Sequence, residues 1–190
     1  KFIDIIMLFG GMSLETQIRT INENNAKIII KNVLKGLEYL HKNKIVHCDL
    51  NPRNILIKNI PKNEIFICDF GLSFVNEKNY IFPINNMIGN KKFLSPEILM
   101  QNKLSYSTDL WSLGIIVYYM ITNNYPFYMV NCYNIKQKID EFKSLKYNNN
   151  KFSEKSYDFI NKLLVFNPED RMTATEALNH EWLVDNEVLN

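Results

Sequence analysis

The chain has 190 residues, of which 46% are hydrophobic and 22% are charged, and its net charge is +2. This size and composition suit one globular domain with a hydrophobic core, and they exclude collagen, a long coiled coil and a disordered chain. The net charge is too small to indicate binding to nucleic acid or to an anionic membrane surface. The longest apolar segment, residues 110–121, is shorter than the roughly 18 residues of a membrane-spanning helix, so we expect a soluble protein.

The cysteines and the first residues bear on the cellular compartment. Cys48, Cys68 and Cys132 are odd in number and have no metal-ligand spacing, so we expect free thiols in a reducing compartment, the cytoplasm or the nucleus. The chain begins with Lys1, and Asp4 interrupts the first apolar residues, which a secretory signal would avoid. These features predict a piece of a longer protein without a secretory signal.

The first predicted element is an amphipathic helix that ends near His41. Its apolar residues recur at steps of three and four: Ala26, Ile29, Ile30, Val33, Leu37 and Leu40. Three short strands rich in β-branched residues are predicted next, at residues 45–46, 55–57 and 65–67, with polar turns between them. Residues 71–96 are predicted to be mostly loop.

The second half of the chain predicts three helices. Residues 107–120 are apolar on nearly every side, which is typical of a helix in the centre of a helical domain, and Ser107 is its expected N-cap. Residues 153–165 and 173–183 predict two amphipathic helices, of which the second opens with a capping box of Thr173 and Glu176. The predicted fold class is therefore mainly α (α+β), a helical domain with one small β element.

Two carboxylates and one amide lie at the ends of the predicted strands. Asp49 and Asn54 lie between the first two strands, and Asp69 directly follows the third. Phosphoryl transfer needs a carboxylate that orients the attacking hydroxyl and oxygen ligands that hold Mg²⁺. Each polar segment alone fits an ordinary turn equally well. The residues by themselves leave both interpretations open.

Five motifs in the same order resemble those of the eukaryotic protein kinase family, and they cover almost the whole chain. They are His47–Asn54, Asp69–Gly71, Ser95–Glu97, Asp109–Gly114 and Asn167–Arg171. The resemblance divides the chain into a hinge-like segment, residues 1–14, and a kinase large lobe, residues 15–190, in which the small β element carries the catalytic loop. The catalytic loop would be residues 47–54 and the activation segment residues 69–97. Pro52, residues 125–127 and residues 179–183 are most similar to serine/threonine kinases of the calcium/calmodulin-dependent group.

The resemblance implies roles for individual residues. Asp49 would orient the substrate hydroxyl, Asn54 and Asp69 would hold Mg²⁺ on ATP, and the cofactor's adenine would lie on Leu56. Ile116 and Met120 would lie with Leu56 beneath the adenine ring. The remaining residues would have structural roles: packing of His47 on Phe70, a turn at Gly71, a buried Glu97–Arg171 ion pair, and bonds from Asp109 to the catalytic-loop backbone. The implied partners are ATP and a protein substrate, with no nucleic acid or membrane, and the regulatory partner is not specified.

Four positions depart from the family pattern. Asn51 replaces a lysine that contacts the transferring phosphate, so this catalytic position loses a cation. Loss of such a contact is worth about 10–150-fold in rate. Asn90 replaces the threonine that partners this lysine, and Cys48 replaces the arginine before Asp49. Arg53 stands where basic-directed relatives place a glutamate, which predicts no preference for arginine near the acceptor hydroxyl.

The sequence contains no Gly-rich loop, no partner lysine and no glutamate-bearing helix of the kinase small lobe. We therefore expect the small β-rich lobe to be absent, and the 190-residue chain alone to bind ATP weakly and to transfer little phosphate. The leading hypothesis is the fragment of a serine/threonine protein kinase. The alternative is a pseudokinase or docking module. A metal-dependent hydrolase is disfavoured, because the other motifs do not serve water activation.

Overall fold

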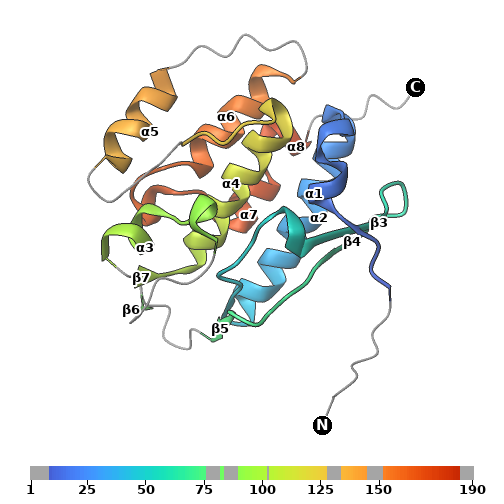
Figure 1. Cartoon of the computed structure of the whole chain (residues 1–190), viewed down its shortest axis with the longest axis horizontal. Coiled ribbons are helices and arrows are strands. Elements are labelled where there is room, and N and C mark those ends of the chain that lie inside the picture. The colour runs from blue at the N-terminus through green and yellow to red at the C-terminus, as the bar shows by residue number, and fades with distance from the viewer. Residues whose placement is uncertain are drawn as a thin grey trace.

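The computed structural model describes residues 9–75, 82–83, 90–101, 103–127, 134–144 and 152–184. Most of the predicted hinge-like segment, the middle of the predicted activation segment and Cys132 lie outside these residues. A group of helices forms most of the molecule, and a small antiparallel sheet lies at the side opposite α5 (Figure 1). Among the described residues, none of the helices could cross a lipid bilayer. The absence of a small lobe stays a prediction.

The elements follow one another along the chain with short connections. The helices are α1 (Leu14–Gln17), α2 (Glu23–Lys42), α3 (Pro96–Gln101), α4 (Tyr106–Thr122), α5 (Ile135–Ser144), α6 (Glu154–Leu163), α7 (Ala174–Leu178) and α8 (Glu181–Val184). The strands are β1 (Met12–Ser13), β2 (Ile45–Val46), β3 (Ile55–Asn59), β4 (Glu64–Ile67), β5 (Phe74–Val75), β6 (Phe82–Pro83) and β7 (Lys103–Leu104). Short 3₁₀ helices are η1 (Ile18–Thr20), η2 (Pro52–Asn54), η3 (Lys91–Phe93) and η4 (Pro168–Asp170).

The long helix α2 confirms the prediction for residues 26–40. The side chain of Asn22 caps it by accepting a hydrogen bond from the Asn25 N–H at 2.9 Å. All six apolar residues of the predicted pattern are buried, because this face packs against α4, α7 and the sheet. Burial of such a face supplies most of the stability of a helix in a protein.

The central helix α4 begins two residues earlier than predicted. Its N-cap is Ser105, whose backbone is extended, and not Ser107. The Ser105 N–H donates to Oγ1 of Thr108 at 3.2 Å, whereas the Ser107 hydroxyl donates to the carbonyl of Pro168 at 2.9 Å. The prediction of Ser107 as the N-cap is wrong, because the hydroxyl of Ser107 is hydrogen-bonded to η4. As expected, α4 is buried on nearly every side.

The prediction of one helix over residues 173–183 is wrong, since α7 and α8 are separate. The amide of Asn179 donates to the carbonyl of Thr175 at 2.8 Å, and Nδ1 of His180 accepts from the Trp182 N–H at 3.2 Å. These side chains compete for backbone groups that a continuous helix would use. The capping box is present, since Oε2 of Glu176 accepts from the Thr173 N–H at 2.8 Å. The helix predicted over residues 153–165 is confirmed as α6.

The β3–β4 hairpin lies against α2 and carries the polar residues of the site at its ends. Strand β3 pairs with β1 and β4 in an antiparallel sheet, and Ile55 is opposite Ile67. Beyond this last pair, the Cys68 N–H donates to the carbonyl of Asn54 at 2.9 Å. The register thus places the start of β3 and the end of β4 side by side. Asn54 and Asp69 therefore lie at the same end of the β3–β4 hairpin, away from its turn.

Candidate active site

Asp109, in the first turn of α4, is hydrogen-bonded to the backbone of the loop of residues 47–54. Its Oδ2 accepts from the His47 N–H at 2.9 Å and its Oδ1 accepts from the Cys48 N–H at 3.0 Å. The side chain is fully buried, and Nε2 of His41 lies 2.9 Å from Oδ2. Cys48 has a left-handed φ of 68°, which is unfavourable for a residue with a side chain. The two hydrogen bonds that Asp109 accepts offset this conformational cost and hold the loop in place.

The carboxylate of Asp49 is held on both of its oxygens. Oδ1 accepts from the backbone N–H of Asn90 at 3.1 Å, and Oδ2 accepts from Nδ2 of Asn54 at 3.2 Å. The same amide nitrogen of Asn54 also donates to the carbonyl of Asp49 at 2.9 Å. Asp49 is half-buried, so its carboxylate is oriented and still reachable. This is the arrangement that a group orienting a substrate hydroxyl requires.

The side chain of Asn51 is used within its own loop. Its Nδ2 donates to the carbonyl of Asp49 at 2.9 Å, and its Oδ1 accepts from the Arg53 N–H at 3.0 Å. The residue is only 5% exposed. Asn90 likewise caps η3 through its side chain, and no hydrogen bond joins the side chains of Asn51 and Asn90 among the described residues. Asn51 therefore supports the loop backbone and does not place a cation beside Asp49.

Asn54 and Asp69 have side-chain oxygen atoms of the kind that a hard divalent cation binds. Both hydrogens of the Asn54 amide are used on Asp49, and its Oδ1 has no hydrogen bond among the described residues. Asp69 is exposed and has a left-handed φ of 65°, and its Oδ1 accepts from the Gly71 N–H at 3.3 Å. No group of three or more acidic, histidine or cysteine ligands occurs in the described part of the chain. One carboxylate, one amide oxygen and added phosphate oxygens fit Mg²⁺, which needs few protein ligands.

His47 and Phe70 are in contact, with ring centroids 5.1 Å apart and planes at 60°. His47 is fully buried, and its Nε2 lies 3.0 Å from the carbonyl of Cys68, while Nδ1 accepts from the Asp49 N–H at 3.3 Å. These bonds assign the proton to Nε2, so the histidine is a structural link between the loop and the end of β4. It is not placed to act as a base.

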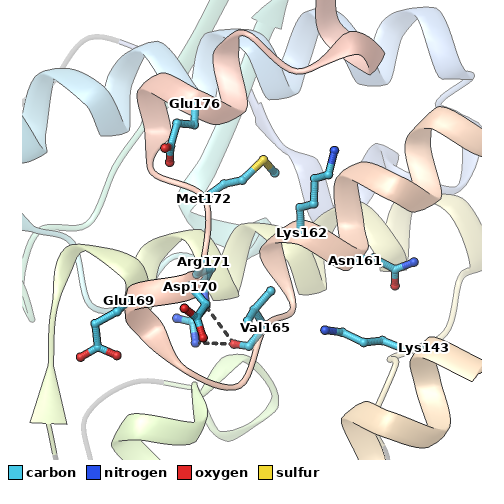
Figure 2. A pocket seen from close by; sticks show the side chains of 9 residues that line it. All are labelled: Lys143, Asn161, Lys162, Val165, Glu169, Asp170, Arg171, Met172 and Glu176. Atoms are coloured by element: carbon cyan, nitrogen blue, oxygen red, sulfur yellow. Dashed lines mark hydrogen bonds between the residues drawn. The ribbon is translucent and has the colours of Figure 1, made fainter.

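Glu97 on α3 and Arg171 after η4 form a buried bidentate ion pair. Nη1 and Nη2 of Arg171 lie 2.9 Å and 3.1 Å from the two carboxylate oxygens of Glu97. The arginine side chain is 0% exposed and the glutamate side chain 2% exposed. Arg171 also donates to the carbonyls of Ser107 and Val165, and Figure 2 shows the bonds to Val165. The pair joins the first turn of α3, at the end of the predicted activation segment, to the residue that follows η4.

A cavity of about 550 Å³ has Arg171 in its lining (Figure 2), and Asp49 is not among its lining residues. Its charged lining residues have both signs: Lys143 and Lys162 face Glu169, Asp170 and Glu176 across it. None of the residues predicted for ATP, metal or catalysis lines this cavity. Its size alone therefore does not make it the reaction site.

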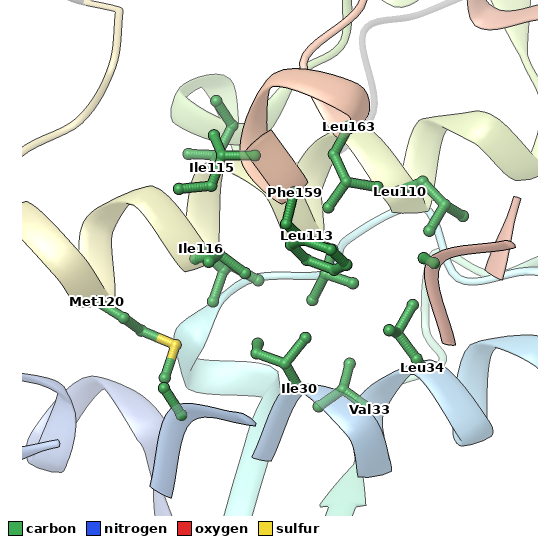
Figure 3. Close-up of a cluster of buried hydrophobic side chains, with 14 of the residues drawn as sticks. Ile30, Val33, Leu34, Leu110, Leu113, Ile115, Ile116, Met120, Phe159 and Leu163 are labelled. Carbon is green, nitrogen blue, oxygen red and sulfur yellow. The ribbon is translucent and has the colours of Figure 1, made fainter. Parts of the chain in front are cut away.

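The residues predicted beneath adenine do not share one surface. Ile116 and Met120 are fully buried in the core with Ile30 and Val33 (Figure 3). Leu56 is half-buried on β3, opposite the exposed Phe66. Of the three predicted residues, only Leu56 is exposed enough to touch a bound ring.

Cys48 and Cys68 lie close to these groups but are poor nucleophiles. Burial, and then the nearby charge of Asp109, raise the pKa of the Cys48 thiol to about 12. Burial, and then the charge of Asp69, raise the pKa of Cys68 above its usual value. A thiol with a raised pKa holds little thiolate at neutral pH. Both cysteines contribute backbone groups to the hydrogen bonds of the loop, and neither thiol is bonded to Asp49.

Two residues at the site escaped the sequence analysis. Glu15 on α1 accepts from Nε of Arg53 at 2.7 Å, so the charge of Arg53 is paired. His41 joins the Asp109 network described above. Both contacts join distant parts of the sequence, and neither has a local pattern that could have predicted it.

Three comparisons with known proteins bear on the family. The model of the protein kinase domain matches residues 5–183. Serine/threonine-protein kinase 17A of Oryctolagus cuniculus is 37% identical over 171 residues, which cover 88% of this chain and 42% of that protein. Death-associated protein kinase 2 of Homo sapiens is 37% identical over 183 residues, which cover 90% of this chain and 47% of that protein. The chain thus spans less than half the length of these relatives.

The fold comparison agrees with the sequence comparisons. The autoinhibited serine kinase domain of the giant muscle protein titin superposes with a TM-score of 0.72 at 27% identity, over 94% of this chain and 57% of that domain. The family model, the two relatives and the shared fold all match nearly the whole chain. This chain therefore belongs to the protein kinase domain family.

Proposed function

We propose that this chain is the large lobe of a serine/threonine protein kinase, which transfers the γ-phosphate of ATP to a hydroxyl of a protein substrate. The observation that carries the proposal is the oriented carboxylate of Asp49, held by the N–H of Asn90 and the amide of Asn54. The names of the related serine/threonine kinases support the substrate class. The substrate hydroxyl would bond to Asp49, which orients it toward the phosphate and accepts its proton.

Asn54 and Asp69 are the proposed holders of Mg²⁺ on the nucleotide. A bound Mg²⁺ would neutralise charge on the phosphate oxygens. Besides holding Mg²⁺, Asn54 would orient Asp49, because its amide nitrogen donates a hydrogen bond to the Asp49 carboxylate. The position of the hydroxyl and the position of the phosphates are therefore coupled through one side chain. Leu56 would contact the adenine ring from the sheet.

A pseudokinase or docking module is the second candidate. The observation that favours it is Asn51, whose side chain is used by its own loop and brings no cation to the phosphate. A missing charge-assisted contact of this kind slows transfer without abolishing it. The oriented Asp49 carboxylate favours the active enzyme over this alternative.

The proposed compartment is the cytoplasm, with the nucleus as the alternative. The free thiols of Cys48 and Cys68 support a reducing environment. The proposed partners are ATP and a protein substrate, and no nucleic acid or membrane is included. The regulatory partner is left open.

The test is phosphate transfer by this chain linked to the small lobe of a related kinase. We expect Mg²⁺-dependent transfer to serine or threonine in a protein substrate, and Asp49→Asn should lower the rate by roughly 10²–10⁴-fold. The matched control is Asp140→Asn, an exposed carboxylate on α5 that should leave the rate unchanged. If Asp49→Asn retains full activity, the proposed mechanism is wrong. If the linked protein binds Mg·ATP but transfers nothing, the pseudokinase is favoured.

A further inference from the structure

A second cavity, of about 240 Å³, lies between η3, α4 and the start of α5. It is smaller than the roughly 300–1,000 Å³ of pockets for drug-sized ligands, so it suits a single side chain. We call it the lysine-rimmed cavity, and its lining residues are Lys91, Lys92, Leu94, Leu99, Trp111, Phe127 and Ile135. Most of this lining is apolar. The polar groups are few and chemically uniform.

Among the described residues that line the lysine-rimmed cavity, every accessible polar side-chain group is a hydrogen-bond donor. The ammonium groups of Lys91 and Lys92 are donors that cannot accept. Both lysines are exposed, and neither forms an ion pair with another described residue. Lys92 lies over the ring of Tyr125, with its Nζ 4.5 Å from the ring centroid. A ligand that fits this lining must bring acceptor atoms and negative charge.

The indole of Trp111 forms part of the wall of the lysine-rimmed cavity. The residue is 1% exposed, and its Nε1 has no hydrogen-bond partner among the described residues. The ring is fixed between Phe127, whose ring is 5.5 Å away and nearly parallel, and the guanidinium of Arg171, 5.1 Å from the indole centroid. Because Nε1 is buried behind this wall, it is not available to a side chain in the cavity, and Trp111 contributes only packing surface.

Hydrogen bonds connect the lysine-rimmed cavity to the carboxylate of Asp49. The N–H of Asn90 donates to Asp49, and the side chain of Asn90 accepts from the Lys92 N–H at 3.2 Å. The carbonyl of Asn90 in turn accepts from the Phe93 N–H at 2.9 Å. Helix η3 is therefore fixed to the group that would orient the substrate hydroxyl. Residues next to that hydroxyl in a bound protein would lie over η3.

We propose that the lysine-rimmed cavity receives a glutamate side chain of the protein substrate, close in sequence to the hydroxyl that Asp49 orients. The methylene groups of the glutamate would pack on the apolar walls, and its carboxylate would accept from Lys91 and Lys92. A lysine or arginine would find only donors there and would be rejected. This inference rests on the proposed function, because it identifies the substrate class of the same site.

The experiment compares two serine-containing peptides that differ only in glutamate or glutamine beside the serine. Binding to the 190-residue chain is measured by calorimetry without nucleotide. We expect the glutamine peptide to bind about tenfold more weakly, which is the effect of one charge-assisted hydrogen bond, with a smaller difference at high salt. The variant Lys91→Gln/Lys92→Gln should lose this discrimination. Its matched control is Lys35→Gln, an exposed lysine on α2, which should retain it.

Further measurements distinguish a carboxylate site from a phosphate site, and a failure of this proposal from a failure of the proposed function. The variant Lys91→Glu/Lys92→Glu should prefer a peptide with lysine in place of glutamate. Equal binding of the two original peptides, or discrimination that survives removal of both lysines, would overturn the proposal. A phosphoserine peptide or inorganic phosphate that displaces the glutamate peptide at equal concentration would show a phosphate site instead. Glutamate-dependent binding without phosphate transfer in the linked protein would contradict the proposed function alone.

Discussion

At the scale of single residues, the site depends on a few charged groups that each bind several partners. Asp109 holds two consecutive backbone N–H groups, and Arg171 binds Glu97 and two carbonyls. Both side chains are buried, so water cannot replace a partner that is lost. Such residues are costly to change even though they do not touch a substrate.

Arg171→Met should destabilise the chain strongly. It removes the guanidinium and leaves the carboxylate of Glu97 buried without its partner, a change that typically costs about 3–5 kcal/mol. The free energy of unfolding in urea measures the effect. Lys138→Met is the control, because its ion pair with Glu141 is exposed and worth at most about 1 kcal/mol. Equal losses for the two variants would contradict the prediction.

The Arg53–Glu15 ion pair bears on whether the protein selects substrates with an arginine near the acceptor hydroxyl. Arg53 is exposed close to Asp49, and its charge is opposed by Glu15. We expect the kinase not to favour arginine near the acceptor hydroxyl, and Arg53→Glu to raise the preference for an arginine peptide several-fold, since two carboxylates then attract the cation. Transfer rates to matched arginine and alanine peptides measure it, with Arg19→Glu as the exposed control. A strong arginine preference in the unmodified protein would refute this expectation.

At the scale of elements, helix ends determine where the chain turns toward the site. The cap of α4 positions Asp109 in the first turn, and the β3–β4 register brings Asn54 next to Asp69. The elements themselves follow from local patterns that the sequence displays. Their ends depend on hydrogen bonds that distant segments offer, as the contact between Ser107 and Pro168 shows.

Thr173→Ala should remove the capping box of α7 and cost about 1 kcal/mol of unfolding free energy. Thr173→Ser is the matched control, because it retains the hydroxyl and should cost much less. The hydrogen bonds from the Thr173 backbone and then its side chain lower the pKa of Glu176. The contribution of this carboxylate is thus full above the ordinary pKa of glutamate and is lost as the pH falls through the lowered value. A loss that does not depend on pH would contradict the role of Glu176.

At the scale of the whole molecule, one hydrophobic core joins the helices and the sheet. The cluster runs from Leu14 through α2 and α4 to Trp182. Glu23 at the start of α2 accepts from the indole of Trp182 at 2.8 Å, so the first long helix and the last helix are also linked by a hydrogen bond. The loop of residues 47–54 is joined to this core through the hydrogen bonds that Asp109 accepts from His47 and Cys48.

The 190-residue chain alone should bind Mg·ATP weakly, and linkage to a related small lobe should tighten binding at least about tenfold. The reason is that Asn54, Asp69 and Leu56 can contact the nucleotide from one side only. Calorimetry with and without Mg²⁺ compares the two proteins. Asp69→Asn in the linked protein should lose the dependence on Mg²⁺. Tight binding by the unlinked chain would contradict this prediction.

The sequence by itself determined the family and the main helices, and it predicted the central residues of the candidate site. The periodicity of apolar residues is a local property, so it predicted α2, α4 and α6 without coordinates. The resemblance of five ordered motifs to the protein kinase family pointed to Asp49, Asn54 and Asp69. Only the tertiary structure decided the break between α7 and α8, the cap of α4, the pairing of Arg53 with Glu15 and the inward direction of Asn51. Each of these depends on which donor and acceptor groups the folded chain brings within hydrogen-bond distance, and a buried polar group bonds to whichever partner is nearest in space.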